Sequence, residues 1–93
     1  MNVDSDALIA QTPDCLAADM GEELVIMIAG RSIYLALDPI GRDVWSRIAT
    51  PCTFSALCDG LSETYEASRT SIEADVATLL GTLHDAGAVA ISH

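Results

Sequence analysis

The apolar pattern of this 93-residue chain changes its period at Asp38-Pro39. Before this point Ile33, Leu35 and Leu37 alternate with small or polar residues, as in a half-buried strand. After it, apolar residues recur about every 3.6 positions, which indicates an amphipathic helix. Aspartate is a good helix N-cap and proline is favoured at the first helical position. The sequence therefore predicts a strand that leads directly into a helix, and the other elements have to pack around this junction.

Two further strands are predicted before the junction. Residues Asp14 to Met20 have a weak strand pattern, and Glu23 to Ala29 contain an apolar run rich in β-branched residues that is typical of a central strand. Gly30-Arg31 is a tight connection, because glycine accepts the positive φ of hairpin turns. The simplest arrangement is a three-stranded antiparallel sheet in which Ser32 to Leu37 is an edge strand.

Three helices are predicted after the junction. The first ends before Pro51, because the residue preceding a proline is disfavoured in a helix, and the second begins at Thr53. The third covers Thr70 to Ala86 and ends at Gly87, which is suited to the left-handed position after a helix.

The third helix carries the strongest boundary signals. Thr70 and Glu73 have the spacing of a capping box at its start, and a short final strand can follow over residues 88–91. This order of elements predicts an α+β fold, a winged-helix-like domain with a three-stranded sheet, three helices and a short final strand. We expect residues 1–13 to form a flexible N-terminal arm and residues 14–93 to form the domain.

The charge balance is strongly acidic. Fourteen Asp and Glu residues face four arginines, and the formal net charge is −10. Such a surface repels nucleic acid and anionic membranes, so neither is expected as a partner. The acids either keep a small apolar protein soluble or attract a basic partner or peptide segment.

Catalytic, metal-binding and targeting patterns are not recognisable in the sequence. Cys15, Cys52 and Cys58 form no Cys-x-x-Cys pair, and neither His84 nor His93 stands in a recognisable triad or zinc pattern. We therefore expect no catalytic residue, metal or other cofactor. The odd number of cysteines, which disfavours a disulfide framework, and the lack of a signal-peptide pattern at the start favour the cytoplasm.

A winged-helix order raises DNA binding as an alternative function. The predicted third helix contains Glu73, Asp75 and Asp85 but no arginine or lysine, so it lacks the side chains that contact bases and phosphates. An exposed strand edge beside an apolar helix can instead accept a peptide as an additional strand. The pattern alone leaves open whether this edge is used or merely tolerated.

A resemblance to a known family favours use of the edge. The run from Ile33 to Trp45, the run from Thr53 to Leu57 and the run from Glu73 to Val89 are together similar to the PqqD-like family. Members of this family are recognition elements for ribosomally made, post-translationally modified peptides. The similar region extends from about residue 14 to 91, and it departs from the family pattern at Ala56 and Ala88.

The resemblance implies that the leader segment of a precursor peptide pairs with the third strand and lies against the third helix, where Asp75 is placed for an ion pair with a basic leader residue. The implied peptide-binding residues lie on these two elements: Ser32, Ile33, Tyr34, Leu35, Ala36, Asp75, Val76, Leu79, Leu80 and Leu83. The implied function is a non-enzymatic adaptor that presents the precursor to a separate processing enzyme, such as a cysteine-protease-like leader peptidase.

Small free-standing members act in split lasso-peptide systems or in pyrroloquinoline quinone synthesis, and this chain resembles the lasso type more. The alternatives are a PqqD-type chaperone of pyrroloquinoline quinone synthesis and an acidic winged-helix interaction or transcription module.

Overall fold

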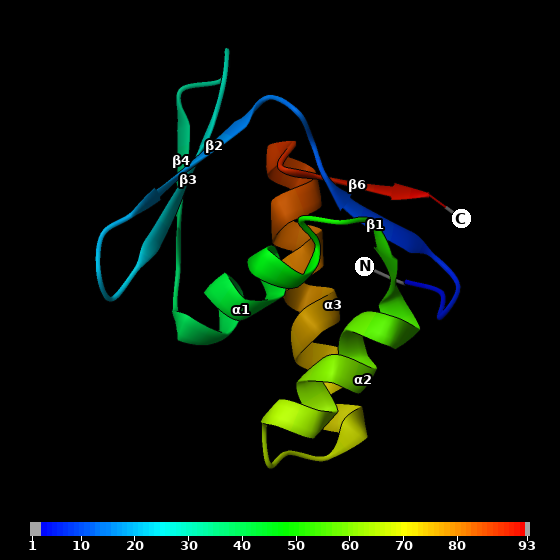
Figure 1. Ribbon diagram of the computed structural model, residues 1–93. Coiled ribbons are helices and arrows are strands. Elements are labelled where there is room, and N and C mark those ends of the chain that lie inside the picture. Colours follow the sequence, from blue (N-terminus) through cyan, green and yellow to red (C-terminus); the bar gives the residue numbers. More distant parts are fainter. Residues whose placement is uncertain (1–2, 93) are drawn as a thin grey trace.

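The computed structural model describes residues 3–92 as two small antiparallel sheets packed around three helices (Figure 1). One sheet has the strand order β2-β3-β4 and the other the order β5-β1-β6. The α+β fold predicted from the sequence is confirmed. The elements in chain order are β1 (Leu8–Gln11), β2 (Cys15–Asp19), β3 (Leu24–Ile28), β4 (Ile33–Leu37), α1 (Pro39–Arg47), β5 (Cys52–Thr53), α2 (Phe54–Thr64), α3 (Arg69–Ala86) and β6 (Val89–Ser92).

The sheet β2-β3-β4 is the predicted meander, with β4 at one edge. One face is turned toward the helices: Leu24, Ile26, Ile28 and Leu37 are buried there, and Ile33 and Leu35 are partly buried against the same core. The predicted alternation of β4 is therefore confirmed. Ser32 has φ 53° and belongs to the turn, so the strand begins one residue later than expected.

The junction at Asp38-Pro39 has the predicted geometry. The Asp38 side chain accepts a hydrogen bond from the Gly41 N–H at 2.7 Å, and Pro39 is the first residue of α1. Thr53 caps α2 in the same way, by accepting from the Ala56 N–H at 3.1 Å. Capping satisfies N–H groups that have no partner within the helix, so these two residues fix where α1 and α2 begin.

The start of α3 differs from the predicted capping box. Ser68 is the N-cap and accepts from the Ser71 N–H at 3.1 Å, so Thr70 lies inside the helix, which begins at Arg69. The end agrees with the prediction, because Gly87 has φ 88° and its N–H bonds to the carbonyl oxygen of His84. Leu80 and Leu83 are fully buried and hold α3 in the core.

The segment expected as a flexible arm contains β1, the central strand of the second sheet. Ala7 and Ile9 are fully buried, and β1 pairs with β6 in the register Leu8 to Ser92 through Gln11 to Val89. Residues 8–11 are structured because these side chains are buried and because β1 pairs with a strand on each side. A domain boundary at residue 13 stays a prediction, and Met1, Asn2 and His93 lie outside the described residues.

The final strand is present but shifted. It covers Val89–Ser92 instead of residues 88–91, and it pairs with β1 and not with the β2-β3-β4 sheet. Across residues 3–92, no helix has both the length and the apolar character needed to cross a membrane.

Candidate peptide-binding site

Two hydrogen bonds at the ends of the β2–β3 pairing show which way the main-chain groups of the sheet point. Met20 donates its N–H to the Glu23 carbonyl oxygen at 2.9 Å, and Ala29 donates to that of Asp14 at 2.9 Å. In β3, odd-numbered residues therefore direct their N–H and C=O toward β2. Because these groups alternate sides along an antiparallel strand, even-numbered residues of β3 direct theirs toward β4.

The free edge of β4 is therefore formed by the main chain of Tyr34 and Ala36. Ile33, Leu35 and Leu37 are the register partners of Ile28, Ile26 and Leu24, so their N–H and C=O groups point to β3. Tyr34 and Ala36 direct two N–H and two C=O groups away from the sheet. No other strand of the described chain pairs with this edge, which leaves it open to an added strand.

This edge runs alongside α3. At the start of β4, the Arg31 guanidinium lies 3.4 Å from the position a Cβ of Gly87 would occupy, so this end is at the C-terminus of α3. Beyond the other end, Ile40 lines a cavity together with Ile72 and Val76 of the N-terminal half of α3. β4 thus runs antiparallel to α3 along much of its length. The half-buried Leu79 lies on α3 between the positions that the two ends of β4 reach.

The cavity is small and mainly apolar. It has a volume of about 80 Å³, and its walls come from the starts of α1 and α3, the end of α2 and the loop between α2 and α3. Ile40 is 52 % exposed, and the exposed Asp75 is the only ionisable carboxylate among the lining residues, which are Ile40, Leu61, Tyr65, Ala67, Ile72, Asp75 and Val76. An aliphatic side chain fits such a cavity, with a basic neighbour facing Asp75.

Tyr65 is held in this wall by an ionic network. Its hydroxyl donates to Asp43 Oδ2 at 2.8 Å, and Arg47 Nε donates to Asp43 Oδ1 at 2.8 Å. The hydrogen bond to the Asp43 carboxylate raises the pKa of the Tyr65 hydroxyl, because the donated proton is stabilised there. The ring is thereby fixed beside the cavity.

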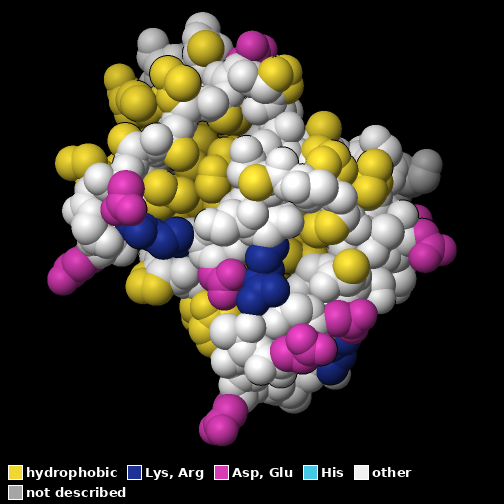
Figure 2. Space-filling model, viewed as in Figure 1, with side chains coloured by type: hydrophobic (Ala, Val, Ile, Leu, Met, Phe, Trp, Pro, Cys, Tyr) yellow, Lys and Arg dark blue, Asp and Glu magenta, His cyan; other side chains and the backbone are white. Residues whose placement is uncertain are grey.

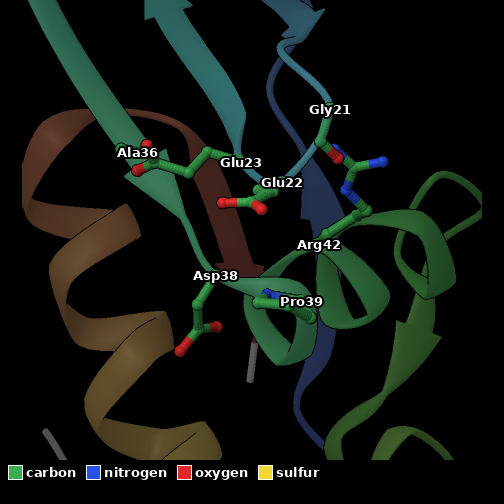
Figure 3. A pocket seen from close by; sticks show the side chains of 7 residues that line it. All are labelled: Gly21, Glu22, Glu23, Ala36, Asp38, Pro39 and Arg42. Carbon is green, nitrogen blue, oxygen red and sulfur yellow. The ribbon is translucent and has the colours of Figure 1, made fainter.

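An open acidic hollow of about 730 Å³ lies at the C-terminal end of β4 (Figure 3). Ala36 and Asp38 of the β4 end contribute to it, together with Glu22 and Glu23 of the β2–β3 turn. Arg42 also lines it, and Figure 3 shows the Arg42 side chain turned toward Gly21.

The Arg42 charge is already neutralised. Its guanidinium donates to both carboxylate oxygens of Asp19, at 2.9 and 2.7 Å, and to the Gly21 carbonyl oxygen at 3.1 Å. The hydrogen bond from Arg42 also lowers the pKa of the Asp19 carboxyl. The remaining side chains leave the hollow with a negative potential, suited to a basic group at the end of the β4 edge.

The structure divides the predicted site residues into two groups. Tyr34 and Ala36 are exposed at the edge, Ser32 is exposed in the turn, and Asp75 is exposed at the cavity. Val76, Leu80 and Leu83 are at most 4 % exposed. Val76 still lines the cavity, but Leu80 and Leu83 cannot contact a peptide unless the core opens. The sequence pattern that marks the apolar side of α3 therefore marks mainly its core side.

Five residues that line the cavity were not predicted as site residues: Ile40, Leu61, Tyr65, Ala67 and Ile72. A partial signal was available, since Asp75 and Val76 follow Ile72 by three and four positions and lie on the same side of α3. Ile40 and Ala67 come from a helix start and a loop, and no local pattern connects them with α3.

Two of the three cysteine thiols are affected by burial. Burial raises the pKa of the Cys52 and Cys58 thiols, which disfavours the reactive thiolate. Among residues 3–92, His, Cys, Asp and Glu nowhere form a group of three or more that could hold a metal ion.

Fold and edge together define a small α+β domain with an open strand edge beside a long helix. The family model described as "Coenzyme PQQ synthesis protein D (PqqD)" matches residues 23–89. This chain belongs to the PqqD family. The match includes β3, β4 and all three helices, and with them the free edge and the small cavity, whereas Gly21 and Glu22 of the acidic hollow lie outside it.

Two solved structures have the same fold. One is "TbiB1 in Complex with the TbiA(beta) Leader Peptide", with a TM-score of 0.79, 20% identity, and coverage of 86% of this chain and 93% of that one. The other is "Lasso peptide synthetase B1 complexed with the leader peptide", with a TM-score of 0.77, 21% identity, and coverage of 88% and 96%. A search of curated proteins found no match.

Proposed function

We propose that this chain is an adaptor that binds the leader segment of a ribosomally made precursor peptide as an additional strand on β4. The observation that carries the proposal is the open edge at Tyr34 and Ala36, which runs beside α3 and directs four main-chain groups outward. Main-chain hydrogen bonds would supply affinity, and the side chains of β4 and α3 would select the sequence.

The comparisons support this proposal. The two solved structures described above carry a leader peptide according to their descriptions, and one is described as a lasso peptide synthetase component. We therefore infer a leader of the lasso-precursor type. The adaptor itself performs no chemistry, and a separate enzyme, such as a cysteine-protease-like leader peptidase, acts on the captured precursor.

The peptide-contacting side chains follow from the same geometry. Ser32, Ile33, Tyr34, Leu35 and Ala36 would line one side of the bound strand. On the helix side, Leu79 is half-buried and Asp75 is exposed, so these two would contact it directly. The 80 Å³ cavity would take an aliphatic leader side chain, and Asp75 would pair with a basic leader residue.

The test is titration of a fluorescently labelled synthetic leader, with anisotropy as the readout. Trp45 is only 6 % exposed, so an external label is a better reporter than its intrinsic fluorescence. The proposal expects saturable binding of the lasso-type leader and weaker binding of Asp75→Asn. Asp85→Asn is the matched control, because Asp85 is also an exposed aspartate of α3 but does not line the cavity.

A second candidate is a carrier of the precursor peptide in pyrroloquinoline quinone synthesis. The description of the matching family model favours it. The same titration distinguishes the two candidates. Tight binding of the precursor peptide of pyrroloquinoline quinone, together with no binding of a lasso-type leader, would favour this second candidate. Failure of both peptides to bind would contradict leader binding altogether.

A further inference from the structure

A group of polar side chains connects α1 with the end of α2 beside the small cavity. Asp43 of α1 accepts hydrogen bonds from the Tyr65 hydroxyl and from Arg47 Nε, each at 2.8 Å. The Arg47 guanidinium also donates through Nη2 to Thr64 Oγ1 at 2.8 Å. We call this group the α1–α2 clamp: Asp43, Arg47, Thr64 and Tyr65. One carboxylate and one guanidinium thus hold the two helices and the Tyr65 ring together.

The Asp43 carboxylate is better shielded from water than the aspartates of two other ion pairs. Its side chain is 24 % exposed, whereas those of Asp19 and Asp59, which pair with other arginines, are 63 % and 61 % exposed. Figure 2 shows arginine side chains lying against acidic ones at the surface of one face. Because shielding from water strengthens charged hydrogen bonds, the clamp holds its geometry better than these exposed pairs.

Gly60 makes room for the clamp. It lies inside α2, where glycine is less favourable than alanine, and its φ is not positive, so the backbone itself does not require glycine. A Cβ at residue 60 would collide with Nη1 of Arg47. The Gly60 carbonyl oxygen also accepts from Thr64 Oγ1 at 3.0 Å, which orients that hydroxyl toward the helix. The missing side chain at residue 60 therefore lets the guanidinium lie on α2.

The clamp determines which part of Tyr65 the cavity meets. The Tyr65 hydroxyl is bound to Asp43, which does not line the cavity, so the ring supplies an apolar wall. On the opposite side, Leu61, Ile72 and Val76 are buried in the core, so the cavity cannot widen there. A Tyr65 ring held in one place keeps the cavity at about 80 Å³.

We propose that Asp43, Arg47 and Gly60 are positioning residues that hold Tyr65 so that the cavity accepts an aliphatic leader side chain and rejects an aromatic one. This inference rests on the proposed function, because it assumes that a leader side chain enters the cavity. A phenyl group needs more room than an aliphatic side chain, and overpacking a closed site is unfavourable. The clamp would thus determine the selectivity of the site without touching the leader.

The test first finds the leader residue that occupies the cavity. Each aliphatic residue of a labelled synthetic lasso-type leader is replaced by alanine, and anisotropy titration measures its affinity for the full chain and for Ile40→Ala. Ile40 lines the cavity and is 52 % exposed, so this variant should fold normally. The anchor residue is the one whose loss is not additive with Ile40→Ala, because contacting residues are coupled.

Selectivity is then measured with the anchor residue replaced by phenylalanine. The wild-type chain should bind the phenylalanine leader about thirtyfold more weakly than the original leader. Gly60→Ala should displace the Arg47 guanidinium, which ends a flexible side chain, and reduce this preference to about threefold. Its unfolding free energy should stay close to that of the wild type, because alanine favours the helix. Tyr65→Phe keeps the ring, removes the bond to Asp43 and should reduce the preference equally.

Asp59→Asn is the matched control. It breaks an ion pair between α2 and Arg69 of α3, and neither residue lines the cavity, so the preference should stay at about thirtyfold. NMR of the complex reports the ring directly. Cross-relaxation between the anchor side chain and the Tyr65 ring should be strong in the wild type and weaker in Gly60→Ala.

The contrary results are distinct. If the wild-type chain shows no preference, or if folded Gly60→Ala and Tyr65→Phe keep it, the clamp does not determine selectivity. If Asp59→Asn lowers the preference as much as Gly60→Ala, the cause is general loosening of α2, which also overturns the proposal. If the leader binds but no residue is coupled to Ile40, the inference fails and the proposed function stands. Failure of the wild-type chain to bind leader contradicts the proposed function itself.

Discussion

Ala36→Pro removes a main-chain donor from the free edge of β4 without removing one from the sheet. The N–H of Ala36 points away from β3, so no ladder bond of the folded domain is lost. The side chain is exposed, and proline is tolerated at edge strands when its nitrogen faces outward. The variant should therefore keep its fold, with at most a modest fall in unfolding free energy.

The expected loss of leader affinity follows from the missing hydrogen bond. A main-chain bond contributes a net of about 0.5–1.5 kcal/mol, and an acceptor left without a partner costs about 1–3 kcal/mol. Ala36→Pro should thus weaken leader binding by about 1–3 kcal/mol, which is about fivefold to about 150-fold. Tyr34→Pro removes the second outward N–H and should have an effect of the same size.

Ala17→Pro is a matched control on the opposite edge of the same sheet. Ala17 is exposed, and its N–H also points outward, since Leu16 and Ala18 are the residues of β2 that face β3. Anisotropy titration of labelled leader, together with urea unfolding of each variant, compares the two edges. Equal leader affinity in Ala36→Pro and the wild type would refute strand addition at β4, and a loss confined to Ala17→Pro would place the peptide on β2.

Three other outcomes are expected. Arg42 lowers the pKa of the Asp19 carboxyl, so this ion pair stabilises the fold above the unfolded pKa of aspartate. Urea midpoints measured at decreasing pH should show this stabilisation disappear as the pH falls through the folded pKa. The variant Asp19→Asn should lack this pH-dependent contribution. Gly87→Ala places a side chain at φ 88° and should destabilise the chain by about 1 kcal/mol in urea unfolding. Leu80→Ala should cost about 2–5 kcal/mol of unfolding free energy, because Leu80 is fully buried. Leu79→Glu should cost less, because Leu79 is only partly buried against the core, and it should weaken leader binding.

The parts of the fold with local signals were predictable from the sequence. The alternation of Ile33, Leu35 and Leu37 fixes which side of β4 is buried, and Asp38 and Gly87 mark helix ends through bonds to nearby backbone. These features depend on residues close in sequence, so a single sequence contains the information.

The second sheet was not predictable in this way. β1 is four residues long, lies in an acid-rich segment, and pairs with β6 about 80 positions away. Ser68 and Thr70 are both chemically able to cap α3, and only the path of the preceding loop selects Ser68.

The candidate site was predictable in its elements but not in all of its side chains. The strand and the helix follow from pattern and family resemblance. The apolar stripe of α3, however, does not distinguish Leu80, which is fully buried, from Leu79, which is half-buried. The cavity depends on α1, α2 and a loop meeting at α3, and this meeting is a tertiary property without a local signature.

Amide hydrogen exchange with and without leader, read residue by residue by NMR, tests strand addition at β4 most directly. A leader paired with β4 protects the amides of Tyr34 and Ala36, which point outward in the free chain, and leaves that of Ala17 exchanging as before. Unchanged exchange at Tyr34 and Ala36 under saturating leader, or new protection at Ala17 alone, would contradict the account.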